Sequence, residues 1–294
     1  MLDRLPQHAA FRYKRRPLLG FTYHAGEDFR LPSTGLRAVA EVVENFELKH
    51  GDRLGHALVL GIDYQDWLQQ RLHKDESYRR RQDSDAWCLQ VRMPRGVYLA
   101  DLIWERRFWQ RTPFRGGNDG QNEAHQQRLG WLDMAITDLA NRLSGTPPLA
   151  ERLLGYYEAR DAHIHLPLEA YHFHDPNKID PRDQEWIDID TKHLQAWERL
   201  RDRLCRDVRQ QGIVIETCPQ SNLAIADLPH DADPPAIALL NKGQPCSIGS
   251  DDPLLFGGRL LDEYALLQQK NCSDEALQRL AATSAKSAFI RARQ

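Results

Sequence analysis

The sequence predicts an α/β fold of the barrel type, and three observations support this. Short apolar runs at residues 18–23, 53–60, 212–216 and 246–249 have the composition of buried parallel strands. Segments with apolar residues at helical spacing follow these runs. Each run also ends in polar residues that can bind metal or transfer protons, and α/β barrels collect their functional residues at the carboxyl ends of the strands.

The first predicted unit begins after residues 1–16, which are polar and basic and show no strand pattern. Residues 18–23 predict a buried strand, because they are nearly all apolar and lie between Pro17 and a polar turn. A helix is expected after residues 32–34, and residues 53–60 predict the next strand. The apolar face of that helix consists of Leu36, Val39, Ala40, Val43 and Phe46.

The last part of the chain repeats this alternation. Residues 212–216 and 246–249 predict strands, and residues 235–241 predict a helix that Lys242-Gly243 ends. Two further helices are predicted over residues 260–270 and 274–290. Ser273 is the expected N-cap of the second, with acidic residues in its first turn. The sequence therefore predicts four strand-and-helix units.

Composition excludes several classes of protein. The 294 residues are 41% apolar, which suffices for a substantial core, and the formal net charge of −3 gives no electrostatic reason to bind nucleic acid. The basic runs at residues 14–16 and 79–81 are interpreted as solvated faces. Five cysteines without paired spacing, no signal core and no apolar run of membrane-spanning length predict a cytoplasmic protein.

Four short segments carry the candidate chemistry. They are His-Ala-Gly-Glu at 24–27, Arg-Leu-Gly-His at 53–56, Cys-Pro-Gln-Ser-Asn at 218–222 and Asp-Asp-Pro at 251–253. A single histidine after a strand is usually a loop residue, but four such endings in this order are specific. They resemble the H-A-G-E, R-[IL]-G-H, C-P-x-S-N and D-D-P elements of the adenosine deaminase family of zinc-dependent hydrolases, and are closer to it than to AMP deaminases.

The resemblance implies the C-terminal half of a TIM-type (β/α)8 barrel, interrupted by an insert. It covers about residues 18–45, 51–60 and 212–294. The family begins with an H-x-H strand that supplies two zinc ligands, and residues 1–20 contain no such element. Because four strands cannot close a barrel, three explanations stay open: a complementing N-terminal half, edges covered by the insert, or a truncated product.

The insert is predicted from the long separation between the second and third segments. His56 and Cys218 are about 160 residues apart, whereas little more than one helix and one strand separates the matching elements in the family. The predicted organisation is a barrel region over 1–60, a mostly helical insert over 61–211 and a second barrel region over 212–294. The insert's expected helices are 64–82, 97–111, 123–143 and 192–210. Its tryptophans are interpreted as core residues: Trp67, Trp87, Trp104, Trp109 and Trp131.

Two histidine pairs within the insert resemble the missing H-x-H element. His163 and His165 form the first, and His172 and His174 form the second. Alternating histidines on a strand point the same way, so either pair could chelate a metal. Both lie after the H-A-G-E element, which would require a rearranged order. Histidines on a loop or on a subunit surface are the alternative.

The resemblance assigns roles to individual residues. His24 and Asp251 correspond to zinc ligands, and Glu27 corresponds to the acid that protonates a purine ring nitrogen. His56 corresponds to the residue that orients the attacking hydroxide and accepts its proton. Two more residues correspond to substrate-binding positions: Asp252, which hydrogen-bonds a second ring nitrogen, and Gly26. Cys218 is interpreted as a buried thiol. For Asp251 and Asp252 the alternative is that residues 250–253 form only a turn, since Asp and Pro favour turns.

Two classes of function follow from these assignments. One is a zinc-dependent deaminase of adenosine or a related purine nucleoside. The other is a non-catalytic or half-site component of a larger assembly, for which the insert offers an oligomer interface and which resembles enlarged deaminase-like proteins of bacterial defence. An amidohydrolase acting on another ring or amide is a third, minor reading.

Overall fold

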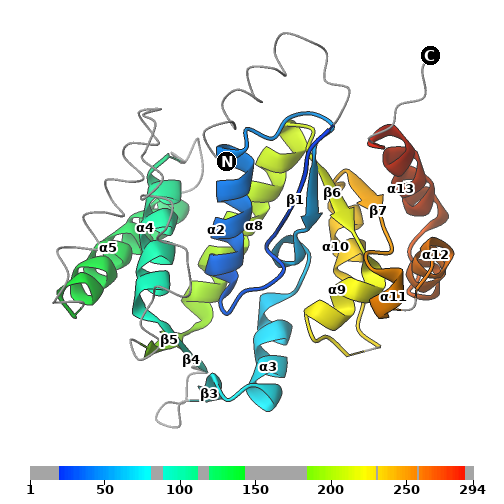
Figure 1. Ribbon diagram of the computed structural model, residues 1–294. Coiled ribbons are helices and arrows are strands. Elements are labelled where there is room, and N and C mark those ends of the chain that lie inside the picture. Colours follow the sequence, from blue (N-terminus) through cyan, green and yellow to red (C-terminus); the bar gives the residue numbers. More distant parts are fainter. Residues whose placement is uncertain are drawn as a thin grey trace, which may run out of the picture. The chain divides into compact units, whose positions relative to one another are not determined.

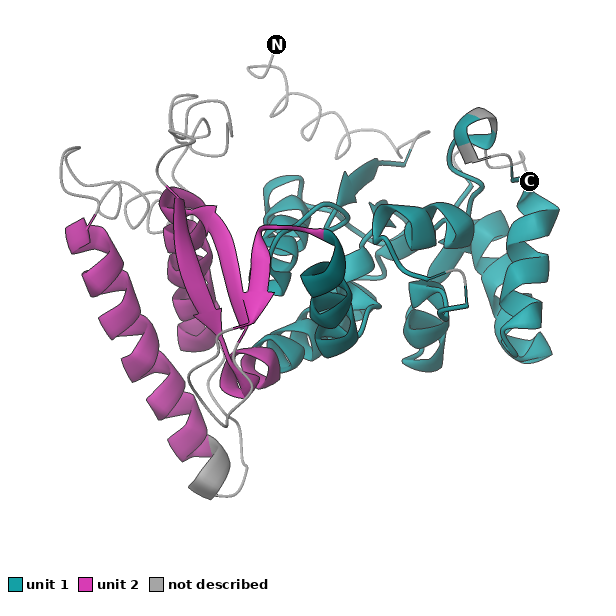
Figure 2. Cartoon of the chain, turned by 90° about the horizontal axis from the view of Figure 1, so that it is seen from below, with its two compact units in different colours: residues 1–74, 197–294 teal, residues 75–196 magenta. Residues whose placement is uncertain are grey.

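The computed structural model describes residues 20–80, 89–111, 119–142, 184–229, 231–256 and 258–288. The chain divides by its internal contacts into unit 1, residues 1–74 and 197–294, and unit 2, residues 75–196 (Figure 2). The organisation predicted from the sequence, with its insert over 61–211, stays a prediction.

Unit 1 is built on a four-stranded, wholly parallel sheet in the order β1-β2-β6-β7 (Figure 1). These strands are β1 (Thr22–Ala25), β2 (Arg53–His56), β6 (Val214–Thr217) and β7 (Cys246–Ile248). Parallel pairing of strands that are joined through helices confirms the predicted α/β fold. The arrangement agrees with part of a TIM-type fold, and closure into a barrel stays a prediction.

Helices in unit 1 follow the strands in the predicted alternation. α2 (Pro32–Asn45) begins at Pro32. Proline is favoured at the first helical position, because the N–H that it lacks would have no partner within the helix. Its apolar face, which includes Leu36, Val39 and Val43, is buried. Ser273 caps α13 as predicted, accepting a hydrogen bond from the Ala276 amide at 3.2 Å. The remaining elements are α3 (Tyr64–Lys74), α9 (Pro219–Ile225), α10 (Pro235–Asn241), α11 (Pro253–Phe256), α12 (Leu260–Gln269) and α13 (Asp274–Lys286).

Two predicted strands differ from those observed. The run at 53–60 leaves the sheet at His56, because His56 and Ala57 adopt positive φ values of 57° and 45°, and residues Leu58–Leu60 form a 3-10 turn. The first strand begins at Thr22, later than predicted. Its residues up to His24 are exposed rather than buried. This exposure follows from position, because β1 is the edge strand of the sheet.

The two edges of the sheet differ. At the β7 edge, the Ile248 amide donates to the Ser284 hydroxyl of α13 at 3.0 Å, so a side chain replaces a neighbouring strand. At the β1 edge, the Phe21 carbonyl accepts from the Arg53 amide at 2.7 Å. Alternation along the strand therefore points the backbone groups of Thr22 away from β2. Among the described residues, no further strand pairs with β1.

Unit 2 contains an antiparallel sheet that the sequence analysis did not predict. Its order is β3-β4-β5, formed by β3 (Tyr78–Arg80), β4 (Leu89–Pro94) and β5 (Gln184–Ile189) (Figure 2). The predicted helix over 64–82 was therefore too long, since α3 ends at Lys74. The other predicted helices are confirmed closely as α4 (Arg95–Arg111), α5 (Asp119–Arg142) and α8 (Thr191–Gln210). α4, α5 and the part of α8 up to residue 196 belong to unit 2.

The tryptophan predictions are mostly confirmed. Trp67, Trp104 and Trp109 are buried, and Trp131 is half-buried beneath the Arg128 guanidinium, which lies 4.3 Å from its ring centroid. Trp87 lies outside the described residues. Within the described ranges, none of the helices combines the length and the apolarity needed to cross a bilayer.

Candidate active site at the carboxyl ends of the parallel strands

The four strand ends of the sheet bring the predicted residues of unit 1 together. His24 lies in β1, His56 ends β2, Cys218 follows β6 and Asp251 follows β7. Both His56 and Asp251 adopt positive φ values, 57° and 54°. Such backbone costs about 1–3 kcal/mol per residue and persists where the surrounding structure enforces it, which is common at functional sites.

His56 is held by a buried amide. Its Nδ1 lies 2.7 Å from Asn222 Oδ1, and Asn222 Nδ2 donates to Thr217 Oγ1 at 3.0 Å. Because the second bond fixes which end of the amide faces the ring, Nδ1 must donate the proton to Asn222. The other ring nitrogen, Nε2, faces the carboxylates of Glu27 and Asp251.

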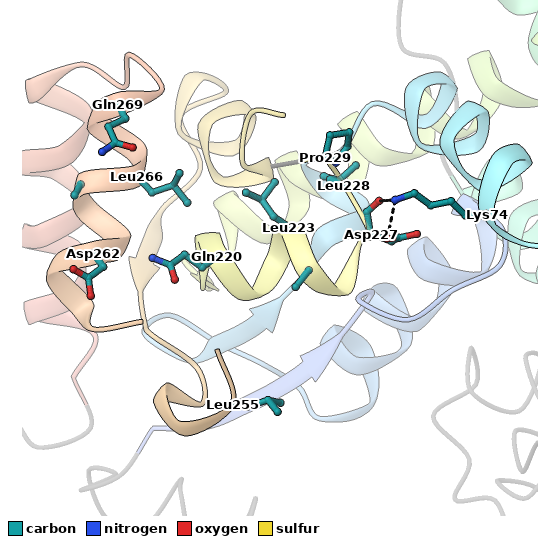
Figure 3. A pocket seen from close by; sticks show the side chains of 12 residues that line it. Lys74, Gln220, Leu223, Asp227, Leu228, Pro229, Leu255, Asp262, Leu266 and Gln269 are labelled. Atoms are coloured by element: carbon teal, nitrogen blue, oxygen red, sulfur yellow. Dashed lines mark hydrogen bonds and ion pairs between the residues drawn. The ribbon is translucent and has the colours of Figure 1, made fainter. Parts of the chain in front are cut away.

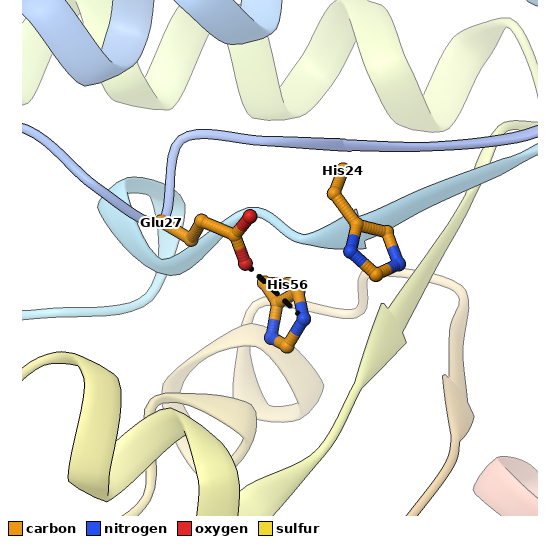
Figure 4. Close-up of side chains that lie close together, drawn as sticks. All are labelled: His24, Glu27 and His56. Carbon is orange, nitrogen blue, oxygen red and sulfur yellow. Dashed lines mark ion pairs between the residues drawn. The ribbon is translucent and has the colours of Figure 1, made fainter. Parts of the chain in front are cut away.

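Nε2 of His56 lies 3.1 Å from Glu27 Oε2 (Figure 4). Since Nδ1 is already a donor, a hydrogen bond between Nε2 and Glu27 requires a single proton that sits on either atom. The pair, here called the Glu27–His56 dyad, therefore has the geometry of a general acid and its base partner. The Glu27 side chain is 29% exposed and that of His56 is 3% exposed, so Glu27 is accessible from solvent whereas His56 is enclosed.

Asp251 approaches the same nitrogen from β7. Its Oδ2 lies 3.8 Å from His56 Nε2 and accepts a hydrogen bond from the buried Ser221 hydroxyl at 2.6 Å. Asp252 points differently: its Oδ1 accepts from the Leu255 amide at 3.2 Å, as the cap of α11. Adjacent carboxylates are thus separated, with Asp251 at the site. This capping contact is the one expected of Asp252 if residues 250–253 form only a turn.

His24 packs directly on the glycine of the next strand. A Cβ at Gly55 would lie 2.1 Å from His24 Cδ2, so only glycine leaves room for the ring. The His24 and His56 rings meet edge to face with centroids 4.7 Å apart. Gly55 is therefore needed for the position of His24, which the R-L-G-H spacing alone does not reveal.

We expect Gly55→Ala to displace His24 with little effect on stability, because the exposed ring can swing away from the new methyl group. A shift of about 1 Å in a reacting group can cost about 100-fold in rate. Zinc content and turnover of the active assembly would measure the effect. Gly130→Ala is the matched control, since a Cβ there meets no atom within 4 Å. Parental values for Gly55→Ala would contradict the expectation.

The donors present fit a metal ion. His24, Glu27 and His56 each offer a ligand atom, and these atoms lie within 4.8 Å of one another (Figure 4). Imidazole and carboxylate are the donors of catalytic zinc. This group of three differs from the pair of ligands predicted from the sequence, His24 and Asp251. Asp251 lies next to the group, with its Oδ2 3.8 Å from His56 Nε2.

A cavity of about 300 Å³ is lined by His24, His56 and Asp251, whereas Glu27 is not among its lining residues. Thr22, Arg53 and Glu216 lie on its sheet face: Glu216 accepts from the Thr22 hydroxyl at 3.1 Å and pairs with Arg53 at 3.3 Å. A larger cavity of about 850 Å³ lies between α9 and α12 (Figure 3). None of His24, Glu27 and His56 lines it, so the smaller cavity is the candidate active site.

The remaining predicted residues have clear places. Gly26 is buried at φ 73°, where a Cβ would lie 2.6 Å from Val39 Cγ2, so its position is set by packing against α2. Cys218 is buried as predicted, and burial together with the Asp251 charge raises the pKa of its thiol to about 12. His163 and His165, like His172 and His174, lie outside the described residues.

Ser221 and Asn222 contact the candidate site residues Asp251 and His56, and the sequence pattern assigned them no role. Both belong to the quoted Cys-Pro-Gln-Ser-Asn run and are fully buried. Their polar type directly after a buried strand was the available signal. Their contacts, to Asp251 and His56, join segments far apart in the chain.

Comparison with known proteins finds a match in the C-terminal part. The family model described as adenosine deaminase matches residues 180–294. These residues are similar to the adenosine deaminase family. This match includes Ser221, Asn222, Asp251 and Asp252, whereas His24, Glu27 and His56 precede it and meet it only in the folded chain.

Individual relatives are deaminases. The chain is 32% identical over 88 residues to an adenine deaminase of Rhizobium meliloti, covering 30% of the chain and 27% of the relative. It is 37% identical over 82 residues to an adenine deaminase of Agrobacterium fabrum, covering 28% and 25%. An aminodeoxyfutalosine deaminase of Acidothermus cellulolyticus is 39% identical over 59 residues, covering 20% and 17%. The chain spans about a quarter or less of the length of these relatives.

Proposed function

We propose that this chain contributes to a zinc-dependent site that deaminates adenine, adenosine or a related purine by hydrolysis. The Glu27–His56 dyad carries the proposal, because it places an accessible acid against a fixed base. The match of residues 180–294 to the adenosine deaminase family model and the deaminase names of the relatives support the reaction class.

His24 and Asp251 would hold the metal in this proposal, with the open side of the cavity toward substrate. Bound zinc supplies a hydroxide nucleophile at neutral pH. Glu27 donates a proton to the ring nitrogen beside the amine-bearing carbon, which makes that carbon more electrophilic. His56 orients the attacking water and takes up its proton through Nε2, since Nδ1 is committed to Asn222. Asp252 and Gly26 would contact the purine. Ammonia leaves, and the ring carbon gains a carbonyl.

The test uses the protein isolated in its native assembly. We expect ammonia release from adenine or adenosine, and loss of that release in His24→Ala. Adenine, adenosine and its 5′-phosphate offered separately would identify the substrate. No ammonia from any of these purines, in an assembly that contains zinc, would contradict the proposed reaction.

A half-site component is the second candidate, favoured by the β1 edge, with which no further strand of the described residues pairs. Phe21 and Tyr23 beside this edge are 40% and 46% exposed, and parallel sheets are ordinarily covered on both faces. A further strand, from another segment or another polypeptide, would cover this edge and complete the site beside His24. The proposed deaminase would then work only in an assembly, for which the insert offers an interface.

We expect the purified chain by itself to retain less than one zinc per molecule, because His24 and Asp251 are only two of the expected ligands. Elemental analysis after dialysis against a mild chelator measures the metal content. Stoichiometric zinc that survives this treatment would contradict the expectation. Replacement of both His163 and His165 by alanine would then show whether that pair completes the site.

A further inference from the structure

Glu263 is a fully buried carboxylate of α12 that has no part in the site described above. Its exposed fraction is 0%, and its Oε2 accepts a hydrogen bond from the Gln220 amide of α9 at 2.9 Å. Its Oε1 is buried and has no hydrogen-bond partner among the described residues. A buried carboxylate with one unsatisfied oxygen is costly, so its presence calls for a physical reason.

The reason lies at the start of α9. The N-cap position is Cys218, whose side chain makes no capping hydrogen bond, and Pro219 has no amide hydrogen. The Gln220 amide is therefore the first backbone donor of the helix. Glu263, which lies 43 residues later in the sequence, accepts its hydrogen bond. Gly258 packs closely here as well, since a Cβ there would lie 2.6 Å from Gln220 Oε1 and 3.2 Å from Glu263 Oε1.

The residues after Gln220 hold the candidate site. Ser221 donates to Asp251 at 2.6 Å, and Asn222 binds His56 Nδ1 at 2.7 Å. A movement of the first turn of α9 would therefore move both Asp251 and His56. Figure 3 shows Gln220 of α9 together with Asp262 and Leu266 of α12 among the residues that line the larger cavity.

We propose that Glu263 is a positioning residue, whose carboxylate fixes the first turn of α9 and through Ser221 and Asn222 sets the geometry of Asp251 and His56. The proposal rests on the proposed deaminase function for its kinetic consequence, but its structural part does not. It gives α12, which carries none of the site residues, a role in the reaction.

The experiment compares three variants in the full chain. Glu263→Met removes the acceptor, and Glu263→Gln keeps one amide oxygen for the Gln220 amide. Leu267→Ala, at a fully buried position one turn later on α12, weakens packing without touching the cap. Imidazole ¹⁵N shifts report the His56 Nδ1 hydrogen bond, denaturant unfolding reports stability, and kcat and KM for purine deamination are measured in the native assembly.

We expect Glu263→Met to change the His56 shifts and to lower kcat by about 10- to 100-fold, as supporting residues around a site typically do, with KM little changed. Glu263→Gln should restore parental shifts and kcat. Leu267→Ala should lose stability, with parental His56 shifts.

Two results would overturn the proposal. One is a Glu263→Met protein with parental His56 shifts. The other is Leu267→Ala shifting His56 as much as Glu263→Met does, because general loosening would then account for both. If the parent protein releases no ammonia from purines, the proposed function fails, and the His56 shifts still decide the role of Glu263.

Discussion

Glu27→Gln is expected to reduce purine deamination by about 100- to 10,000-fold, the usual contribution of a general acid or base. Glutamine keeps the shape of Glu27 but cannot give a proton to the substrate. It can still donate an amide hydrogen to His56 Nε2, which lies 3.1 Å from Glu27 Oε2, so the fold and the position of His56 should be preserved. Steady-state kinetics and zinc content of the active assembly measure the two effects separately.

Asp28→Asn is the matched control, because Asp28 is the next residue and is exposed. It should leave the rate unchanged. Near-parental turnover in Glu27→Gln would remove Glu27 from the mechanism. Loss of zinc together with activity would instead make Glu27 a metal ligand, as its place in the group with His24 and His56 allows.

Asp251→Asn is expected to lower zinc affinity by about 10- to 100-fold, whereas Asp252→Asn keeps the zinc and weakens purine handling. A neutral amide is a poorer ligand for a doubly charged cation than a carboxylate. The structure separates the two residues, since Asp251 accepts from Ser221 beside His56 and Asp252 accepts from the Leu255 amide. Asparagine is also a good N-cap, so Asp252→Asn should retain the start of α11.

Zinc content and steady-state kinetics of both variants in the active assembly form the measurement. For Asp252→Asn we expect a higher KM or a lower kcat at parental zinc content. Parental zinc and parental activity in both variants would leave residues 250–253 only the role of a turn. Equal loss of zinc in both would mean that the two carboxylates are not functionally separate.

Local signals were sufficient for most helices of the chain. The pattern of apolar residues predicted α2, α4, α8 and α10 to within about three residues at either end, because helices that pack against a core carry apolar residues at helical spacing. The Ser273 cap was equally local, since its hydroxyl bonds an amide three residues later. Strand composition predicted the four parallel strands of the described residues. Runs buried on both faces are nearly all apolar, which fits β2, β6 and β7, whereas β1 is largely exposed.

Strand ends and the second sheet were beyond these signals. Residues 53–60 remain apolar past His56, so composition cannot show that positive φ values at His56 and Ala57 end the strand there. β3 is only three residues long and follows α3 closely, and it is stabilised by pairing with β4. Such pairing depends on a partner strand elsewhere in the chain and leaves no local period.

The sequence by itself determined the inventory of chemistry: two histidines, a glutamate and an aspartate at strand ends, in an order that resembles one family. Only the tertiary structure decided how they act together. Asn222 fixes the tautomer of His56 across a separation of 166 residues, and Ser221 holds Asp251. The physical reason is that parallel strands bring their carboxyl ends to one edge of the sheet, whereas hydrogen bonds between those ends depend on distances that no sequence spacing contains.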